Sequence, residues 1–144
     1  MNAFSSRIAE INDILSAVNL LQWDARVMMP PGGAATRGQQ IATLKAKARE
    51  LLLEASTEDA AETVMATSGD ERERRAAGDV LAARKWHLSV PPALLRRQDE
   101  ISILAGRAWE KARAEGDFSL FRPHLAEIVS LARQMAGAIG YDAH

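Results

Sequence analysis

The chain has 144 residues, 18 of them basic and 19 acidic, so one domain with a sizeable core is expected and the net charge is -1. This balance excludes the basic excess on which nucleic-acid and anionic-membrane binding depend. Cysteine is absent, which excludes disulfides, thiol catalysis and cysteine zinc sites. No signal peptide and no run of roughly 20 apolar residues is present, so we expect one cytoplasmic domain over residues 1–144, without membrane or nucleic-acid partners.

The first half of the chain predicts three helices. Apolar residues recur three or four positions apart from Phe4 to Trp23, which is the spacing of one helix face. The same periodicity resumes from about Ala35 to Ala55. Ser56, followed by two acids, indicates the N-terminus of a short helix that ends near Thr67.

The second half predicts three more helices. The fourth follows a turn at residues 67–70 and ends at Val90, since that residue precedes a proline. Pro91 and Pro92 open the fifth helix, and residues 115–117 form the turn into the last one. The apolar stripes expected to be buried are, in the fourth helix, Ala76, Val80, Ala83 and His87; in the fifth, Leu94, Ile101, Ala105, Ala108 and Ala112; and in the sixth, Leu125, Ile128, Ala132, Met135 and Ile139.

The last two helices are predicted to form an antiparallel hairpin. Their apolar spacing is close to a 3.5-residue period and the connection is short, as in coiled-coil packing. Each arm should be about 35 Å long at a rise of about 1.5 Å per residue. No strand pattern competes, so the predicted fold is all-α, an antiparallel helical bundle with a long C-terminal hairpin.

The most distinctive stretch is the break between the first two helices, LLQWDARVMMPPGGAATRGQQ from Leu20 to Gln40. Two consecutive prolines supply no amide donors and force Met29 and Pro30 into an extended conformation. We expect Trp23 to close the first helix as an apolar anchor. Asp24 is expected to accept hydrogen bonds from loop amides; the alternative is that it lines a groove shared with another domain.

The sequence offers no catalytic constellation. A metal-binding helix presents two ligands one turn apart, as in H-E-x-x-H, and no such pair occurs here. His87 is expected to be a half-buried residue beside Trp86 at a helix end, His124 to be exposed, and His144 is the last residue. There is no nucleophile elbow or phosphate-binding loop, and Trp86 and Trp109 are expected to pack against neighbouring helices.

The break nevertheless resembles a known signature. Its residues Trp23, Asp24, Met29, Pro30 and Arg37 match the pattern W-D-x-x-x-x-M-P-x-x-x-x-x-x-R near the N-terminus of the carboxypeptidase Taq family, which consists of thermostable metal-dependent carboxypeptidases. The stretch from Val90 to Tyr141 is similar to the next helices of the family, so the resemblance extends over nearly the whole chain.

The resemblance implies a helical wall and cap of a deep groove in an enzyme that removes C-terminal amino acids from peptides. The family's zinc is held by an H-E-x-x-H helix and a downstream glutamate, none of which lies in this sequence. We therefore expect no catalytic, cofactor or metal residue here, no activity of this polypeptide alone, and a peptide substrate only where the catalytic part is present. The alternative is a stand-alone helical interaction module that associates with itself or with a partner.

An oligomer follows from the same argument. Helices that lean on a larger domain should leave an apolar face exposed, and large exposed apolar patches usually have a partner. We expect a homo-oligomer, a dimer in the simplest case, with the hairpin or the first helix in the interface.

Overall fold

The computed structural model describes residues 2–140, which contain six α-helices, two short 3-10 helices and no strand. The helices are α1 (Ala3–Val27), α2 (Ala34–Leu53), α3 (Ala55–Thr67), α4 (Glu71–Ser89), α5 (Pro92–Glu115) and α6 (Arg122–Ile139), with 3-10 turns at Pro31–Gly33 and Phe118–Leu120. The all-α prediction is confirmed. Tyr141 and His144 lie outside the described residues.

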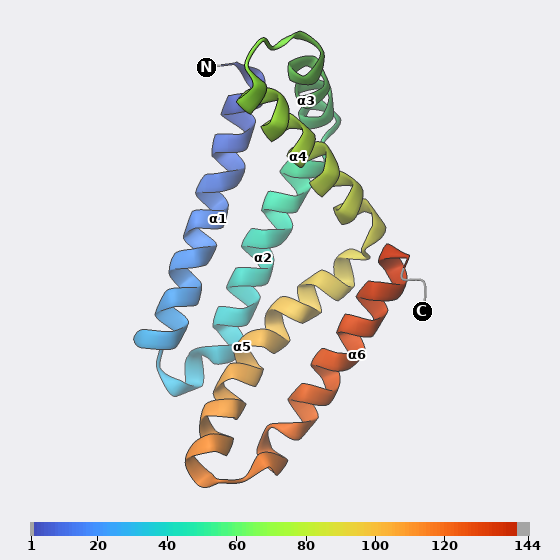
Figure 1. The fold of residues 1–144 in the computed structure, drawn as a ribbon. Helices are drawn as coiled ribbons and strands as arrows, with labels where there is room; N and C mark the ends of the chain where they lie inside the picture. The colour runs from blue at the N-terminus through green and yellow to red at the C-terminus, as the bar shows by residue number, and fades with distance from the viewer. Residues whose placement is uncertain (1, 141–144) are drawn as a thin grey trace.

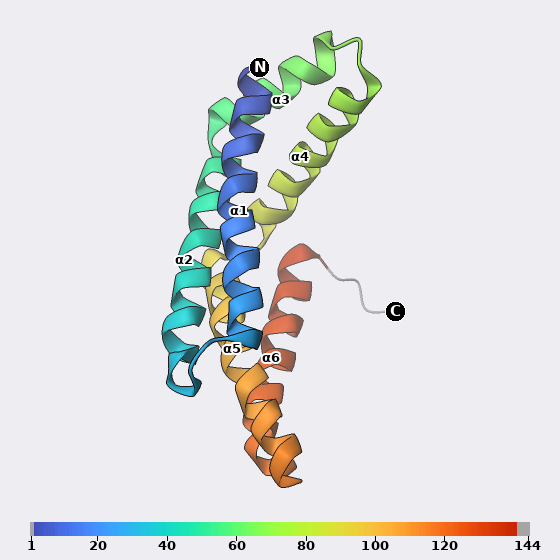
Figure 2. The same cartoon turned by 90° about the vertical axis from the view of Figure 1, so that its left-hand side faces the viewer.

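The helices form an elongated arrangement centred on α2 (Figure 1). Helix α2 packs against α1 on one side and, most extensively, against α5 on another. Helices α3 and α4 pair at one end, and the predicted hairpin of α5 and α6 projects beyond the α1–α2 connection at the other end (Figure 2). The segment between the arms is longer than predicted, because Asp117 caps a 3-10 turn by accepting from the Ser119 amide at 2.9 Å.

Helix ends follow the local chemistry of the sequence. Asn2 caps α1 by accepting a hydrogen bond from the Ser5 amide at 2.7 Å, and Asp70 caps α4 in the same way. Helix α5 ends at Gly116, whose φ of 66° is in the left-handed region that glycine adopts without strain. The predicted cap at Ser56 is wrong: α3 already begins at Ala55, directly after a bend at Glu54.

The buried face of α1 is spaced at seven residues, through Phe4, Ile11, Val18 and Ala25. Helix α2 turns small residues toward α5, and a Cβ added at Gly38 would lie 3.2 Å from the carbonyl oxygen of Glu100. Ile41 and Ile101 are almost completely buried in this part of the core. The α2–α5 contact is thus close enough that a side chain at position 38 would need the backbone of α5 at Glu100 to shift by a few tenths of an ångström.

Two predicted stripes need correction. In α4, Ala76 is exposed and Ala77 and Arg84 are the buried residues. In α6, Leu131 is the one buried residue, while Leu125, Ala132 and Ile139 of the predicted stripe are exposed. The sequence of α6 therefore has an apolar face, but the rest of residues 2–140 leaves much of that face exposed.

Candidate functional site

The signature segment at the end of α1 is held by an ion pair. The carboxylate of Asp24 on α1 binds the guanidinium of Arg37 on α2. Arg37 also donates to the Leu21 carbonyl at 3.0 Å and to the side-chain oxygen of Gln40 at 3.1 Å. The expectation that the Asp24 side chain would accept hydrogen bonds from loop amides is therefore wrong, because its carboxylate binds Arg37 instead. It is the backbone carbonyl of Asp24 that accepts from the amides of Met28 and Met29, at 2.9 and 3.0 Å.

Met29 and Pro30 turn the chain toward α2. Met29 is buried in a cluster with Ala25 and Ala34, against Ile103 and Leu104 of α5. Pro30 is extended, with φ −59° and ψ 150°, and its carbonyl accepts from the Gly33 amide at 2.9 Å. The break predicted from the two prolines is confirmed, although α1 continues past Trp23 to Val27.

Trp23 faces outward, so the prediction that it closes the first helix as an apolar anchor is wrong. Its side chain is 56% exposed. Leu20 and Val27 are also exposed and lie on the same face of α1 as Trp23, and Met28, the C-cap directly after the helix, is exposed as well. We call Leu20, Trp23, Val27 and Met28 the outer stripe of α1. Of the five signature residues, Trp23 is therefore the one that points away from the α1–α2 connection. The other four form this connection or the ion pair beside it.

Three arginines that the sequence analysis did not select hold the C-terminal ends of helices. Arg107 of α5 donates to the carbonyls of Ala25 and Met29 at 3.0 and 2.9 Å. Arg84 of α4 donates to the carbonyls of Leu52 and Glu54, and Arg49 of α2 donates to that of His87 at 2.7 Å. Cations are favourable at these helix ends because the last carbonyls have no intrahelical partner. In the sequence, the position of Arg84 within an otherwise apolar stripe of α4 is the signal that could have identified it as a buried residue.

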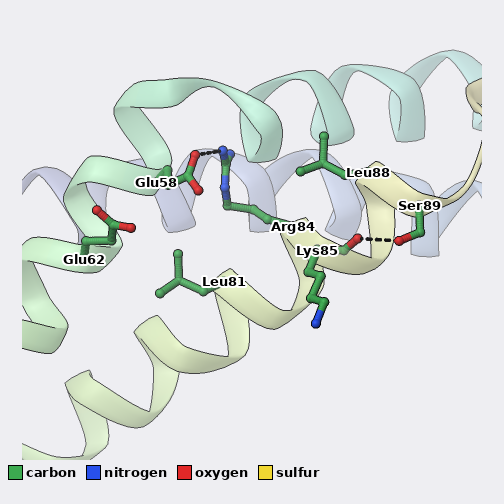
Figure 3. A pocket seen from close by; sticks show the side chains of 7 residues that line it. All are labelled: Glu58, Glu62, Leu81, Arg84, Lys85, Leu88 and Ser89. Carbon is green, nitrogen blue, oxygen red and sulfur yellow. Dashed lines mark hydrogen bonds and ion pairs between the residues drawn. The ribbon is translucent and has the colours of Figure 1, made fainter. Parts of the chain in front are cut away.

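Two surface hollows adjoin two of these arginines, Arg107 and Arg84. One, of about 210 Å³, lies between α1 and α5 under the signature segment, with Ala25, Met29 and Ile103 as apolar lining and Arg26, Arg107 and Glu110 as charged lining. The other, of about 510 Å³, lies between α3 and α4 (Figure 3). We call the second one the α3–α4 groove. It is lined by Glu58, Glu62, Leu81, Arg84, Lys85, Leu88 and Ser89.

The histidines do not converge. His87 on α4 is partly buried, stacks edge-on against Trp86 with ring centroids 4.8 Å apart, and has a buried Nδ1 without a hydrogen-bond partner. Burial, and secondly the charge of Arg49, lower the pKa of His87. His124 lies on α6 and is partly buried rather than exposed. Within residues 2–140 no group of three or more His, Asp or Glu side chains is placed to hold a metal ion. The described residues therefore do not supply the set of ligands that a zinc ion needs.

The remaining tryptophans are only half covered. Trp86 and Trp109 are both exposed, although Trp86 contacts His87 and the guanidinium of Arg113 lies 5.3 Å above the ring of Trp109. Both contacts lie within a single helix, so they do not support the predicted packing against neighbouring helices. No helix among the described residues is long and apolar enough to cross a membrane.

Comparison with known proteins identifies the family. The family model described as "Carboxypeptidase Taq (M32) metallopeptidase" matches residues 3–144. The chain belongs to the carboxypeptidase Taq family. It is 33% identical over 127 residues to Thermostable carboxypeptidase 1 of Pyrococcus furiosus, covering 88% of this chain and 26% of that protein. It is 24% identical over 143 residues to Carboxypeptidase 1 of Bacillus subtilis, covering 98% of this chain and 28% of that protein.

Solved structures of the family have the same fold. The crystal structure of BsuCP superposes with a TM-score of 0.89 at 23% identity, over 98% of this chain and 29% of that one. The Pyrococcus furiosus carboxypeptidase in its apo-Mg form superposes with a TM-score of 0.69 at 30% identity, over all of this chain and 30% of that one. The chain thus spans between a quarter and a third of the length of its relatives.

Proposed function

We propose that these residues form one helical wall of a metal-dependent carboxypeptidase, an enzyme that removes C-terminal amino acids from peptides, and that they have no peptidase activity alone. The family match over residues 3–144 supports the proposal most directly. The metal and its ligands would belong to the remaining part of the enzyme, where the metal would polarise the scissile carbonyl and activate water.

The distribution of exposed apolar side chains supports a wall. The outer stripe of α1 and the residues Leu125, Val129 and Ile139 of α6 are apolar but exposed. Burying such surface stabilises an assembly by about 25 cal/mol per Å². A catalytic part that covered both surfaces would be held to this wall by that burial.

A chimera tests the proposal. The segment of Bacillus subtilis Carboxypeptidase 1 that aligns with this chain is replaced by this chain, and hydrolysis of a blocked dipeptide is measured with zinc or cobalt. We expect the chimera to be active, and both the isolated chain and the Bacillus enzyme without its N-terminal segment to be inactive. Turnover by the isolated chain that increases in proportion to its concentration would contradict the proposal.

A self-associating module is the second candidate, favoured by the same exposed side chains. We propose that the isolated chain forms a homodimer through the outer stripe of α1 or through α6. Light scattering of wild type and of the double variant Leu125→Ser/Val129→Ser separates the two surfaces. A wild-type chain that stays monomeric at micromolar concentration would contradict the dimer.

A further inference from the structure

One side of α6 carries a row of apolar residues that the rest of residues 2–140 leaves partly uncovered. These residues recur four and three positions apart, which places them on one side of the helix. They are Leu125, Val129, Ala132, Ala136 and Ile139. The three large side chains are 37%, 41% and 49% exposed, although α5 lies along another side of α6 (Figure 1). We call these five residues the α6 seam.

The shape of the α6 seam fits a second helix. Its spacing is close to the 3.5-residue period at which two helices pack nearly parallel to each other. Ala132 and Ala136 form its middle, and larger side chains stand at both ends. Two small residues in the middle allow another helix to approach to about 8 Å between axes, the short end of the usual range. The seam therefore favours a helix over an irregular segment.

The charges beside the seam have one sign. Arg122 lies one turn before the seam, and Arg133 lies next to it, on the flank opposite to the buried Leu131. Both arginines are exposed, and neither has an ion pair with a residue in the range 2–140. Glu127 is the only acid in α6, and it binds Arg97 of α5. A helix on the seam is therefore favoured if its flank is acidic.

The two arginines also set the position of the acids on such a helix. Arg122 and Arg133 are three turns apart, which is about 16 Å along the helix axis. A helix that lies alongside α6 thus needs two acidic residues about three turns apart on the same flank. This spacing distinguishes the expected partner from a helix that is only apolar on one side.

Most of the enzyme lies outside this chain. The chain spans 26% of the Pyrococcus furiosus enzyme and 28% of the Bacillus subtilis enzyme that it resembles. A segment of the same enzyme is present at a high effective concentration beside α6, which favours it over a separate protein.

We propose that the α6 seam binds an amphipathic helix from the part of the carboxypeptidase outside this chain, and that acidic residues of that helix pair with Arg122 and Arg133. The apolar contact supplies most of the stabilisation, at about 25 cal/mol per Å² buried. The ion pairs fix the position and direction of the helix. This inference rests on the proposed function, because it assigns the covering helix to the same enzyme.

The experiment measures hydrogen exchange of α6 in the isolated chain and in the chimera with Bacillus subtilis Carboxypeptidase 1. Ala132→Trp enlarges the middle of the seam, where the second helix approaches most closely. Because Ala132 is exposed, this variant should leave exchange in the isolated chain unchanged. In the chimera it should remove the protection that α6 gains there. Ser130→Trp, an exposed position on the far side of α6, is the matched control and should keep this protection.

Two single variants test the acidic flank. Arg122→Gln and Arg133→Gln should each speed the exchange of α6 in the chimera about two- to five-fold, which is the range for exposed ion pairs. The effect should shrink as salt is added. Arg75→Gln on α4, which is also exposed, is the control. An effect no larger than that of Arg75→Gln would overturn the pairing with acids.

The outcomes separate this docking from the proposed function. Docking is overturned if α6 exchanges as fast in the chimera as in the isolated chain while α2 and α5 are protected, whether or not the chimera is active. It is also overturned if Ala132→Trp leaves α6 protected, or if protection in the isolated chain rises with concentration, since a second copy would then cover the seam. An inactive chimera with a protected α6 would support the docking and contradict the proposed function.

Discussion

Helices α5 and α6 are the two arms of one hairpin, yet they are buried to very different degrees. Helix α5 lies against α2, and its Ile101, Ala105 and Ala112 are buried. Helix α6 lies mainly against α5, and Leu131 is its one buried residue, although its sequence is the more strongly amphipathic of the two. Periodicity therefore predicts that a helix has an apolar face, but not that the same chain covers it.

The largest expected effect comes from truncating one apolar residue in each arm, a buried one in α5 and an exposed one in α6. Ile101→Ala should lower the free energy of unfolding by about 2–5 kcal/mol, because Ile101 is 1% exposed and its removal leaves a cavity. Leu125→Ala should cost less than about 1 kcal/mol, because Leu125 is 37% exposed. Urea unfolding followed by circular dichroism measures both, and equal losses would contradict the difference between the arms.

This comparison also separates what the sequence could predict from what it could not. Proline pairs and apolar periodicity were sufficient for the helices and for the all-α fold, since these depend on local sterics and on the period of the helix, whereas the cap predicted at Ser56 was wrong. An exposed apolar face was predicted in general terms, but the outward position of Trp23 and the residues exposed on α6 were not, because periodicity does not say which apolar side chains the rest of the chain covers. Arg84 and Arg107 were missed, because their acceptors are carbonyls at the ends of other helices, far away in the sequence.

The second effect concerns the arginine that joins the bend after α2 to α4. Arg84→Met keeps the aliphatic stem but leaves the carbonyls of Leu52 and Glu54 without their donor. We expect a loss of about 1.5–3 kcal/mol, the range for a hydrogen bond to a charged group. Arg75→Met, at an exposed position on the same helix, is the control and should change stability by less than about 0.5 kcal/mol. A similar loss in both variants would show that Arg84 does not hold the bend.

A smaller effect is expected in the signature segment. Asp24→Ala should cost up to about 1 kcal/mol, because the ion pair with Arg37 is partly exposed. Arg37→Ala should cost more, since Arg37 also donates to the Leu21 carbonyl. A double-mutant cycle with both substitutions measures the coupling between the two side chains. Additive losses would show that the pair does not stabilise the α1–α2 connection.

The smallest effect is a pH dependence. Burial and Arg49 lower the pKa of His87 in the folded chain below its ordinary value of 6.5. The unfolded chain therefore takes up this proton first, and the stability should fall as the pH drops below that value. His87→Gln should unfold in urea with a weaker pH dependence between pH 7.5 and 5.5 than the wild type. Identical pH dependences would show that His87 has the same pKa in the folded and unfolded chains.

Hydrogen exchange tests the difference between the arms most directly. The amides of α6 are compared in the isolated chain and in the chimera with Bacillus subtilis Carboxypeptidase 1. If the apolar face of α6 is a surface for the rest of the enzyme, its amides should exchange faster in the isolated chain and become protected in the chimera, while α2 and α5 are protected in both. Equal protection of α6 in the two proteins would contradict this account.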